Sequence, residues 1–301
     1  MVKYSIVIPA HNEEQYIRIT LNSLVNQTVL PYQIIVVDDH STDRTAEIVQ
    51  EYTTAYAFVK LLQVKSTNEH QPGSKVILAF EKGYKLLDKL FDVIVKLDAD
   101  LDLPTDYFEQ ILKVFEQNEK VGMVGGHAYI EKNGEWKLES LTDKDHIRGA
   151  FKAYRKETFD AIGGLKPQMG WDTVDELLAK YNGWEVKTIP TLKVKHLKPT
   201  GANYNKGALQ KQGEAYYTLG YGLMISMIAA AKLAVNKGKI SYFFGYMKGY
   251  LMAAKKRIPK MVDKKQEQFI RYYRWKNIRK KIKNLIVCSN ALLFFCVSKF
   301  H

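Results

Sequence analysis

Two carboxylates stand one residue apart directly after a short apolar run in the first third of the chain. The run extends from Val93 to Leu97, and the carboxylates are Asp98 and Asp100. Such a run predicts one buried strand, and side chains two apart on extended backbone point the same way. The pair suits a hard cation such as Mg²⁺ or Mn²⁺, which takes oxygen ligands and often keeps waters or substrate phosphates. The alternative for an isolated Asp-x-Asp is a solvated acidic turn.

Two further strands are expected to end in polar residues that could join this pair. Lys3 to Pro9 leads into a loop that carries Glu13, and Gln33 to Val37 leads into Asp38 and Asp39. Helical patterns lie between the strands, which predicts βαβ units and a parallel sheet. Ligands of such sheets bind outside the carboxyl ends of the strands, so we expect these acids to share one crevice. A cation there would relieve their mutual repulsion.

A third group of acids lies in the middle of the chain. Residues 170–178 read Gly-Trp-Asp-Thr-Val-Asp-Glu-Leu-Leu, which predicts a loop entering a helix. Asp172 or Thr173 would cap that helix, and Asp175 and Glu176 would complement its dipole. A functional role for these acids is the alternative.

One histidine follows the next expected strand. Trp184 to Val194 has a strand-like pattern that Pro190 interrupts, and His196 comes directly after it. A single histidine is most often structural, but its place at a strand end also allows a ligand role. Both interpretations stay open at this point.

Four segments in this order resemble the inverting family-2 glycosyltransferases of GT-A fold. They are SIVIPAHNEE, VVDDHSTDRT, KLDADLDLP, and RGAFKAYRKETFDAIGGL followed by GWDTVDELLAKYNGW. The resemblance runs from about Tyr4 to His196. It implies an α/β fold with a mostly parallel, Rossmann-like central sheet flanked by helices. It also implies that residues 1–200 form the catalytic domain that binds a nucleotide sugar.

The resemblance assigns donor-binding roles residue by residue. Asp39 would contact the base of the donor nucleotide, with Pro9 and Glu13 beside it. Lys75 and Arg148 could assist with the diphosphate, although either could equally be a surface charge. The donor class, whether UDP, GDP or dTDP, is left open.

The resemblance also implies a metal and a catalytic base. Asp98 would contact the ribose or the water shell of the metal, and Asp100 would ligate the Mg²⁺ or Mn²⁺ that bridges the donor diphosphate. His196 would complete the metal shell. Asp172 would be the base, because it lies at the usual distance before the Gly-Trp that follows its helix. The chain departs from the family here: Trp-Asp replaces the usual Glu-Asp pair, which keeps Asp175 as an alternative base.

The charge of the chain is distributed unevenly. The net charge is +13, but residues 1–200 hold 25 Lys and Arg against 29 Asp and Glu, whereas residues 201–301 hold 20 against 3. A basic terminal third predicts a polyanionic partner, either a membrane surface or nucleic acid. Only Cys288 and Cys296 occur, which fits a reducing compartment. The first expected strand begins near Lys3, so we expect no signal peptide.

A long helical pattern begins near Asp263 in this basic region, and it combines an apolar stripe with lysines and arginines. Such a helix is typical of membrane interfaces. We therefore expect residues 201–301 to be a helical region that attaches to the anionic inner face of the cell membrane from the cytoplasm. The alternative is packing on the catalytic domain; nucleic acid is disfavoured because no nucleic-acid-binding motif occurs. The stripe comprises Trp275, Ile278, Ile282, Leu285, Ser289, Leu292 and Cys296.

These expectations combine into one predicted activity. The chain would be a metal-dependent inverting glycosyltransferase of cell-surface polysaccharide synthesis. It would move a sugar from a nucleotide-sugar donor to a hydroxyl of a glycan acceptor, such as a lipid-linked one. One alternative is a sugar nucleotidyltransferase, which usually needs a glycine-rich basic loop where this chain has the acidic PAHNEE. Another is a non-catalytic nucleotide- or membrane-binding protein of the same fold.

Overall fold

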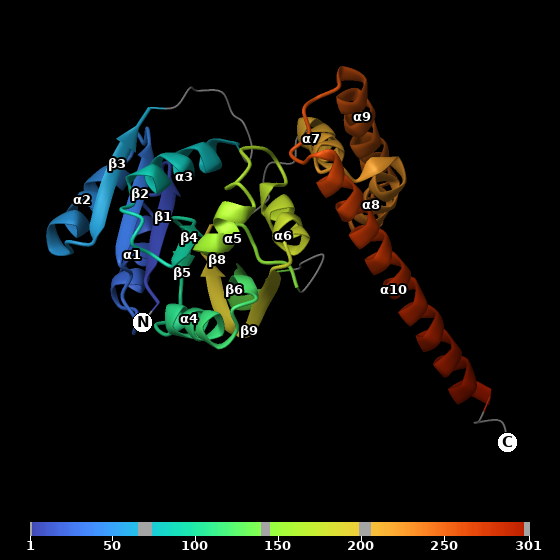
Figure 1. The fold of residues 1–301 in the computed structure, drawn as a ribbon, viewed down its shortest axis with the longest axis horizontal. Coiled ribbons are helices and arrows are strands. Elements are labelled where there is room, and N and C mark those ends of the chain that lie inside the picture. Colours follow the sequence, from blue (N-terminus) through green and yellow to red (C-terminus); the bar gives the residue numbers. More distant parts are fainter. Residues whose placement is uncertain (1, 66–73, 140–144, 199–205, 298–301) are drawn as a thin grey trace. The chain divides into compact units, whose positions relative to one another are not determined.

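The structure is a computed structural model that describes residues 2–65, 74–139, 145–198 and 206–297, with the backbone alone for residues 206 and 284–297. The chain divides into two compact units, Met1–Asn203 and Tyr204–His301. Each unit is a separate body with its own secondary structure (Figure 1).

The first unit is built on a sheet of nine strands, counted over the described residues, in the order β3-β2-β1-β4-β8-β6-β9-β5, with β7 beside β6. In its first half, neighbouring strands run parallel, as predicted. These strands are β1 (Tyr4–Ala10), β2 (Gln33–Asp39), β3 (Val59–Val64) and β4 (Val93–Leu97). Every residue of β1, β2 and β4 is buried, as expected for strands covered on both faces.

The second half of the sheet is mixed. β8 runs antiparallel to β4 and to β6, whereas β6 and β9 run parallel. β5 joins the free edge of β9 in the antiparallel sense, and β7 forms a hairpin with β6. The bounds are β5 (Leu101–Asp102), β6 (Val121–Lys132), β7 (Glu135–Leu138), β8 (Phe151–Arg155) and β9 (Glu185–His196).

Pro190 does not end its strand, contrary to the expected interruption. β9 continues from Glu185 to His196, and the irregularity appears in its pairing with β6. Gly125 pairs with Thr188, but His127 pairs with Lys193, so β9 carries extra residues between these points. A bulge of this kind accommodates a proline within a sheet. Because β9 continues past Pro190, its last residue, His196, pairs with Leu101 of β5.

Helices flank the sheet (Figure 1). α3 approaches β1 and β2 so closely at Gly83 that a Cβ there would lie 2.6 Å from the Val7 side chain and 2.7 Å from that of Val37. Buried Thr20 of α1 donates to the carbonyl of Ala99 (2.8 Å) and accepts the Leu101 N–H (2.9 Å), which fixes the turn after β4. The helices are α1 (Ile17–Val25), α2 (Thr45–Ala55), α3 (Ser74–Leu86), α4 (Tyr107–Gln117), α5 (Lys156–Ala161) and α6 (Trp171–Tyr181).

The second unit is helical in its described part. α7 and α9 cross at glycines: a Cβ on Gly213 would lie 1.8 Å from the carbonyl oxygen of Tyr246, and one on Gly249 would lie 2.0 Å from that of Gln210. The helices are α7 (Lys206–Thr218), α8 (Gly222–Asn236), α9 (Ile240–Lys256) and α10 (Lys264–Val297).

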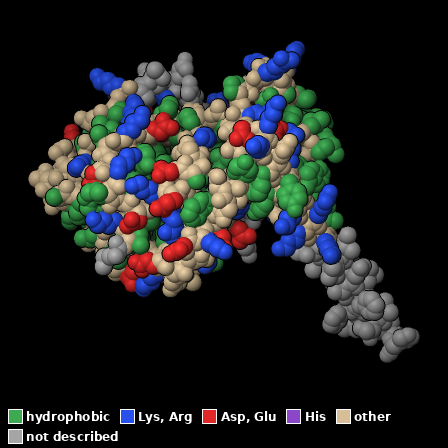
Figure 2. Space-filling view, viewed as in Figure 1, with side chains coloured by type: hydrophobic (Ala, Val, Ile, Leu, Met, Phe, Trp, Pro, Cys, Tyr) green, Lys and Arg blue, Asp and Glu red, His purple; other side chains and the backbone are tan. Residues whose placement is uncertain are grey.

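Large apolar side chains are exposed on α8 and α9. Figure 2 shows hydrophobic side chains gathered over these helices with lysines and arginines around them. None of the helices in the described part of the chain combines the length and the apolar character that a bilayer crossing requires. The predicted stripe on α10 includes Leu285, Ser289, Leu292 and Cys296, whose side chains lie outside the described ones, as does that of Cys288. The exposed apolar residues of α8 and α9 are Leu223, Met224, Ile228, Val235, Ile240, Phe244, Leu251 and Met252.

Candidate active site

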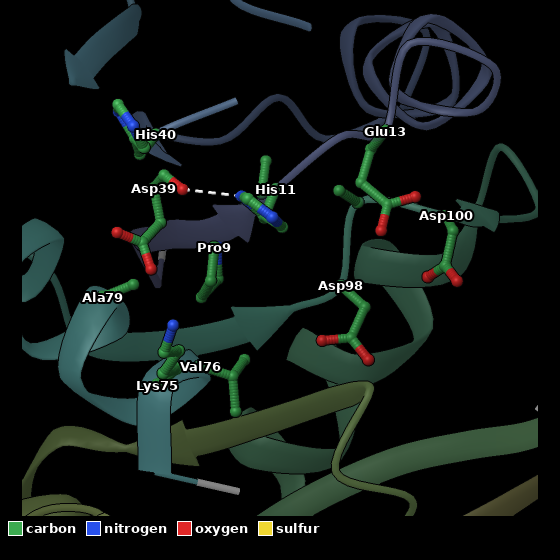
Figure 3. Close-up of a pocket in the computed structure, with 12 residues that line it drawn as sticks. Pro9, His11, Glu13, Asp39, His40, Lys75, Val76, Ala79, Asp98 and Asp100 are labelled. Carbon is green, nitrogen blue, oxygen red and sulfur yellow. Dashed lines mark hydrogen bonds between the residues drawn. The ribbon is translucent and has the colours of Figure 1, made fainter. Parts of the chain in front are cut away.

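The carboxyl ends of β1, β2 and β4 meet at one cleft of about 480 Å³. Ala10 pairs with Asp38, and Val7 pairs with Lys96, so β1, β2 and β4 end at the same edge of the sheet. The cleft contains six of the ten residues for which a site role was predicted: Pro9, Glu13, Asp39, Lys75, Asp98 and Asp100 (Figure 3). Its other lining residues are Ala10, His11, His40, Val76, Ala79 and Ala99.

The loops after β1 and β2 are joined by hydrogen bonds that position Glu13. Asn12 accepts the N–H of Thr42 through its side chain (2.8 Å), and the N–H of Glu13 binds Thr45 Oγ1 (2.8 Å). Lys198 Nζ lies 2.6 Å from one carboxylate oxygen of Glu13. The other oxygen is buried and has no hydrogen-bond partner among the described residues. Burial raises the pKa of Glu13, although Lys198 opposes the shift. Glu13 therefore keeps an unused acceptor in the cleft.

The side of the cleft near Asp39 contains two histidines that the sequence reasoning did not single out. His11 Nδ1 lies 2.7 Å from the backbone oxygen of Asp39, so that nitrogen must carry the proton. His40 follows Asp39 with a φ of 59°. Lys75, in the first turn of α3, lies across the cleft from Asp39 (Figure 3). The position of His11 directly after a strand, inside the PAHNEE segment, was the signal that could have identified it.

Asp98, Asp100 and His196 form a group that could hold a metal, because each offers one ligand atom and these atoms lie within 4.8 Å of one another. The pairing of Leu101 with His196 brings the ends of β4 and β9 together. His196 Nε2 lies 3.2 Å from Asp100 Oδ2, and its buried Nδ1 has no hydrogen-bond partner among the described residues. Two carboxylates and an imidazole fit Mn²⁺, and Mg²⁺ through the carboxylates. The donor set thus fits the predicted metal.

Lys96 forms an ion pair with Asp98 and is buried. Lys96 and Lys198, which pairs with Glu13, are two cations of the site that the sequence did not predict. A lysine inside the otherwise apolar run of β4 was the available signal, because a cation in a strand buried on both faces needs a partner. Lys96 offsets one negative charge beside the metal group.

Neither Asp172 nor Thr173 caps α6, so the predicted cap is wrong. The helix begins at Trp171 behind Gly170, whose φ is 89°, and no side chain caps it. Asp172 therefore lies within the first turn, with 31% of its side chain exposed. Gly149 lies against it: a Cβ there would be 2.7 Å from the Trp171 ring and 3.0 Å from the Asp172 Cβ. The next residue, Ala150, accepts the N–H of Asp98 at 2.7 Å. A short backbone segment thus links Asp172 to the acids of β4.

Asp175 and Arg148 have close protein partners. Asp175 is buried and accepts hydrogen bonds from Lys152 Nζ (2.9 and 3.0 Å) and from the hydroxyl of Tyr154 (2.6 Å). Burial raises the pKa of Asp175 against the attraction of Lys152. Arg148 forms a two-pronged ion pair with Glu139, with Nε 2.8 Å from Oε2. The four predicted site residues that do not line the cleft are Arg148, Asp172, Asp175 and His196.

Residues 5–167 match the family described as Glycosyl transferase family 2. The chain belongs to this family. It is 28% identical over 216 residues to the probable glycosyltransferase YdaM of Bacillus subtilis, a match that covers 62% of the chain and 49% of YdaM. The chain thus spans about half the length of this relative.

Solved structures of low sequence identity show the same fold, which confirms the predicted α/β GT-A class. The first 349 residues of TarS from S. aureus, in complex with UDP-GlcNAc, superpose with a TM-score of 0.59 at 18% identity, over 82% of this chain and 79% of that one. The mannosyltransferase PcManGT from Pyrobaculum calidifontis, in complex with GDP-Man and Mn²⁺, gives 0.54 at 17% identity, over 94% and 87%.

Proposed function

We propose that this family-2 chain is a metal-dependent inverting glycosyltransferase that transfers a sugar from a nucleotide-sugar donor to an acceptor hydroxyl. The observation that carries the proposal is the meeting of Asp39, Asp98 and Asp100 in one cleft, with His196 beside Asp100. The solved structures of TarS with UDP-GlcNAc and of PcManGT with GDP-Man and Mn²⁺ support a nucleotide-sugar donor for this fold.

In this proposal the cleft divides into a nucleotide part and a metal part. Asp39 binds the base, with Pro9 and Glu13 beside it, and the free acceptor of Glu13 is available to the ribose or the base. Lys75 lies across the cleft from Asp39 (Figure 3) and is the better placed of the two predicted diphosphate-binding cations. Arg148 would first have to leave Glu139.

Asp100 and His196 would hold the metal, and Asp98 would contact the ribose or the metal's water shell. A bound Mg²⁺ or Mn²⁺ neutralises the charge that develops on the diphosphate leaving group. Lys96 limits the negative charge of the group because it already pairs with Asp98.

Asp172 is the better candidate for the base than Asp175. A general base must reach the proton that it removes, and Asp172 is partly exposed, whereas the Asp175 side chain is 1% exposed and bound to Lys152 and Tyr154. Cations around Asp172 outweigh the effect of burial and lower its pKa to about 2. Asp172 is therefore ionised at neutral pH and can accept the hydroxyl proton as the oxygen attacks the anomeric carbon opposite the leaving group.

For the acceptor, we propose a lipid-linked glycan at an anionic membrane surface, bound by the second unit. The support is the charge of +17 over residues 201–301 and the exposed apolar residues of α8 and α9. Met224, Ile228 and Val235 follow one another at helical spacing, so α8 presents a continuous apolar stripe. Basic residues beside exposed apolar ones are typical of interfacial helices. We propose attachment through α8 and α9 in addition to α10.

Thermal unfolding with UDP, GDP and dTDP, each with Mn²⁺, Mg²⁺ or EDTA, tests the donor site. A ligand at about 100 times its dissociation constant adds about 2.7 kcal/mol to the free energy of unfolding. We expect one nucleotide to raise the unfolding temperature in a metal-dependent way and its sugar conjugate to support transfer. Binding without turnover over a panel of donors and acceptors would instead favour a non-catalytic nucleotide-binding protein, and release of diphosphate from a sugar phosphate and a nucleoside triphosphate would favour a nucleotidyltransferase.

A further inference from the structure

His146 lies between two carboxylates of α6. Its Nδ1 is 3.0 Å from Glu176 Oε1, and its Nε2 is 3.6 Å from Asp172 Oδ2. Asp172 and Glu176 are four residues apart and therefore lie one above the other on the helix. His146 belongs to the segment that enters β8, so the contact joins two elements that are distant in sequence.

The surroundings of this histidine favour its protonated form. A neutral imidazole has one N–H donor and one acceptor nitrogen, and an acceptor nitrogen facing a carboxylate would repel it. Both nitrogens of His146 face carboxylates, so the arrangement favours the imidazolium over either neutral form. Burial opposes this charge, but the two carboxylates outweigh it and raise the pKa of His146 to about 9.

The carboxylate of Glu176 is held in place by several contacts. It is 6% exposed, and its Oε1 also accepts the N–H of Ile147 (2.9 Å) and Nζ of Lys152 (3.2 Å). Lys152 in turn binds Asp175 and the backbone carbonyl of Asp172. The contact with Asp172 is the longer of the two: the distance of 3.6 Å exceeds that of a hydrogen bond, and the Asp172 side chain is 31% exposed.

Further charges surround the pair. Lys180 Nζ lies 3.9 Å from the other oxygen of Glu176, and Lys152 and Arg148 contribute positive potential at Asp172. Three carboxylates of α6 thus face Lys152, Lys180 and His146. Without the imidazolium, Asp172 would lose its nearest cation.

We propose that His146 is a positioning residue: as an imidazolium anchored on Glu176, it holds the carboxylate of Asp172 ionised and directed toward the acceptor hydroxyl. This proposal rests on the proposed function, in which Asp172 is the base. The proton of the acceptor hydroxyl passes to Asp172 as the oxygen forms its bond to the anomeric carbon. The bond from that carbon to the diphosphate breaks, and its electron pair leaves with the diphosphate. His146 gives up no proton in this step.

The titration of His146 can be measured without turnover. In protein labelled with ¹³C at the histidine Cε1, NMR follows each ring over pH, and His146→Gln assigns its signal. We expect His146 to titrate near pH 9 and to titrate at lower pH in Glu176→Gln, because one of its two carboxylates is then neutral. Glu135→Gln, on the exposed strand β7, is the control and should leave the titration unchanged. A midpoint near 6.5 or below in the unaltered protein would overturn the proposal.

Transfer kinetics test the role in catalysis. His146→Gln should lower kcat roughly ten- to a hundredfold through misplacement of Asp172 and leave KM for the donor within about twofold. The alkaline limb of the kcat profile should follow the titration of His146 and move to lower pH in Glu176→Gln. A kcat within twofold of normal in a folded His146→Gln protein contradicts the role. Absence of transfer in the unaltered protein, with the NMR titration as expected, would instead reject the glycosyltransferase assignment and the catalytic role together.

Discussion

Lys96 and Lys152 are direct cross-strand partners on β4 and β8, and both are buried. Like charges at opposed positions of a sheet destabilise it unless they are compensated. Each lysine has its own carboxylates, Asp98 for Lys96 and Asp175 with Glu176 for Lys152. The ring of Trp171 lies 5.2 Å from Lys96 Nζ and 5.9 Å from Lys152 Nζ. Trp171 thus adds a cation–π contact to both lysines.

Lys152→Met should destabilise the first unit. Removal of one partner from a buried ion pair typically costs about 3–5 kcal/mol because the remaining charge is left uncompensated. Here Asp175 and Glu176 would lose their shared cation. Urea unfolding followed by tryptophan fluorescence measures the change. Lys195→Met, which breaks the exposed pair with Asp102, is the matched control and should cost less than about 1 kcal/mol. Equal effects of the two substitutions would contradict the assigned importance of the buried network.

Asp100→Asn should weaken metal binding. The substitution removes a charged ligand, and we expect a loss at least as large as the roughly 10–100-fold that follows loss of an outer-shell partner. Titration of Mn²⁺ followed by electron paramagnetic resonance measures it directly. Asp102→Asn changes a nearby acid that lies outside the cleft and pairs with Lys195, so its Mn²⁺ affinity should stay normal. An unchanged affinity in Asp100→Asn would remove Asp100 from the metal site.

Asp172→Asn and Asp175→Asn should have different consequences. The first should lower kcat by roughly 10²–10⁴-fold, the usual contribution of a general base, with little change in the unfolding temperature. The second should mainly destabilise the protein, because the Asp175 side chain is buried against Lys152 and Tyr154. Steady-state kinetics beside thermal unfolding distinguish the two. The reverse pattern would identify Asp175 as the base.

Gly249→Ala should destabilise the second unit. Its methyl group would lie 2.0 Å from the backbone oxygen of Gln210, so α7 and α9 would have to separate. Overpacking of this kind costs about 1–3 kcal/mol or more. Gly207→Ala on α7 meets no atom within 4 Å and should be neutral or slightly stabilising. Circular dichroism during urea unfolding of both variants provides the measurement, and similar stabilities would argue against a tight α7–α9 crossing.

Phe244→Glu should reduce binding to anionic vesicles. Phe244 is 65% exposed on α9, and a charge there would oppose insertion of the exposed apolar side chains of this helix into the membrane. Co-sedimentation with phosphatidylglycerol-containing and phosphatidylcholine vesicles should show binding only to the former, weakening as salt rises. Leu90→Glu, at an exposed apolar position of the first unit, serves as the control. Equal binding by both variants would argue against α9 as a contact surface.

Much of the fold followed from local patterns. The run that becomes β4 has the predicted bounds because its four apolar residues are buried, together with Lys96, which is paired with Asp98. α3 ends at Leu86, and the turn that follows contains Lys89 with a φ of 67°, which no sequence pattern indicated. The cap of α6 was predicted wrongly because Gly170 supplies the left-handed residue there.

The cleft proposed to bind the donor was predictable from the sequence, whereas the surroundings of Asp172 were not. The carboxyl ends of parallel strands lie at one edge of a sheet. The presence of acids after three expected strands was therefore enough to predict that they meet. The network of His146, Lys152 and Glu176 depends instead on β8 running antiparallel beside β4. That pairing joins segments far apart in the chain, and no periodicity within either segment specifies it.

The reversed direction of β8 also has an evolutionary meaning. Phe151, its first residue, pairs with Leu97, the last residue of β4. The site therefore uses the segment that enters β8, whereas on β1, β2 and β4 it uses the segments that leave the strand. In the proposed function, recognition of the donor and support of the base thus depend on separate connections of the chain. Each connection can change in length or composition while the strands keep their register, so the surroundings of the base can vary without a change in the donor cleft.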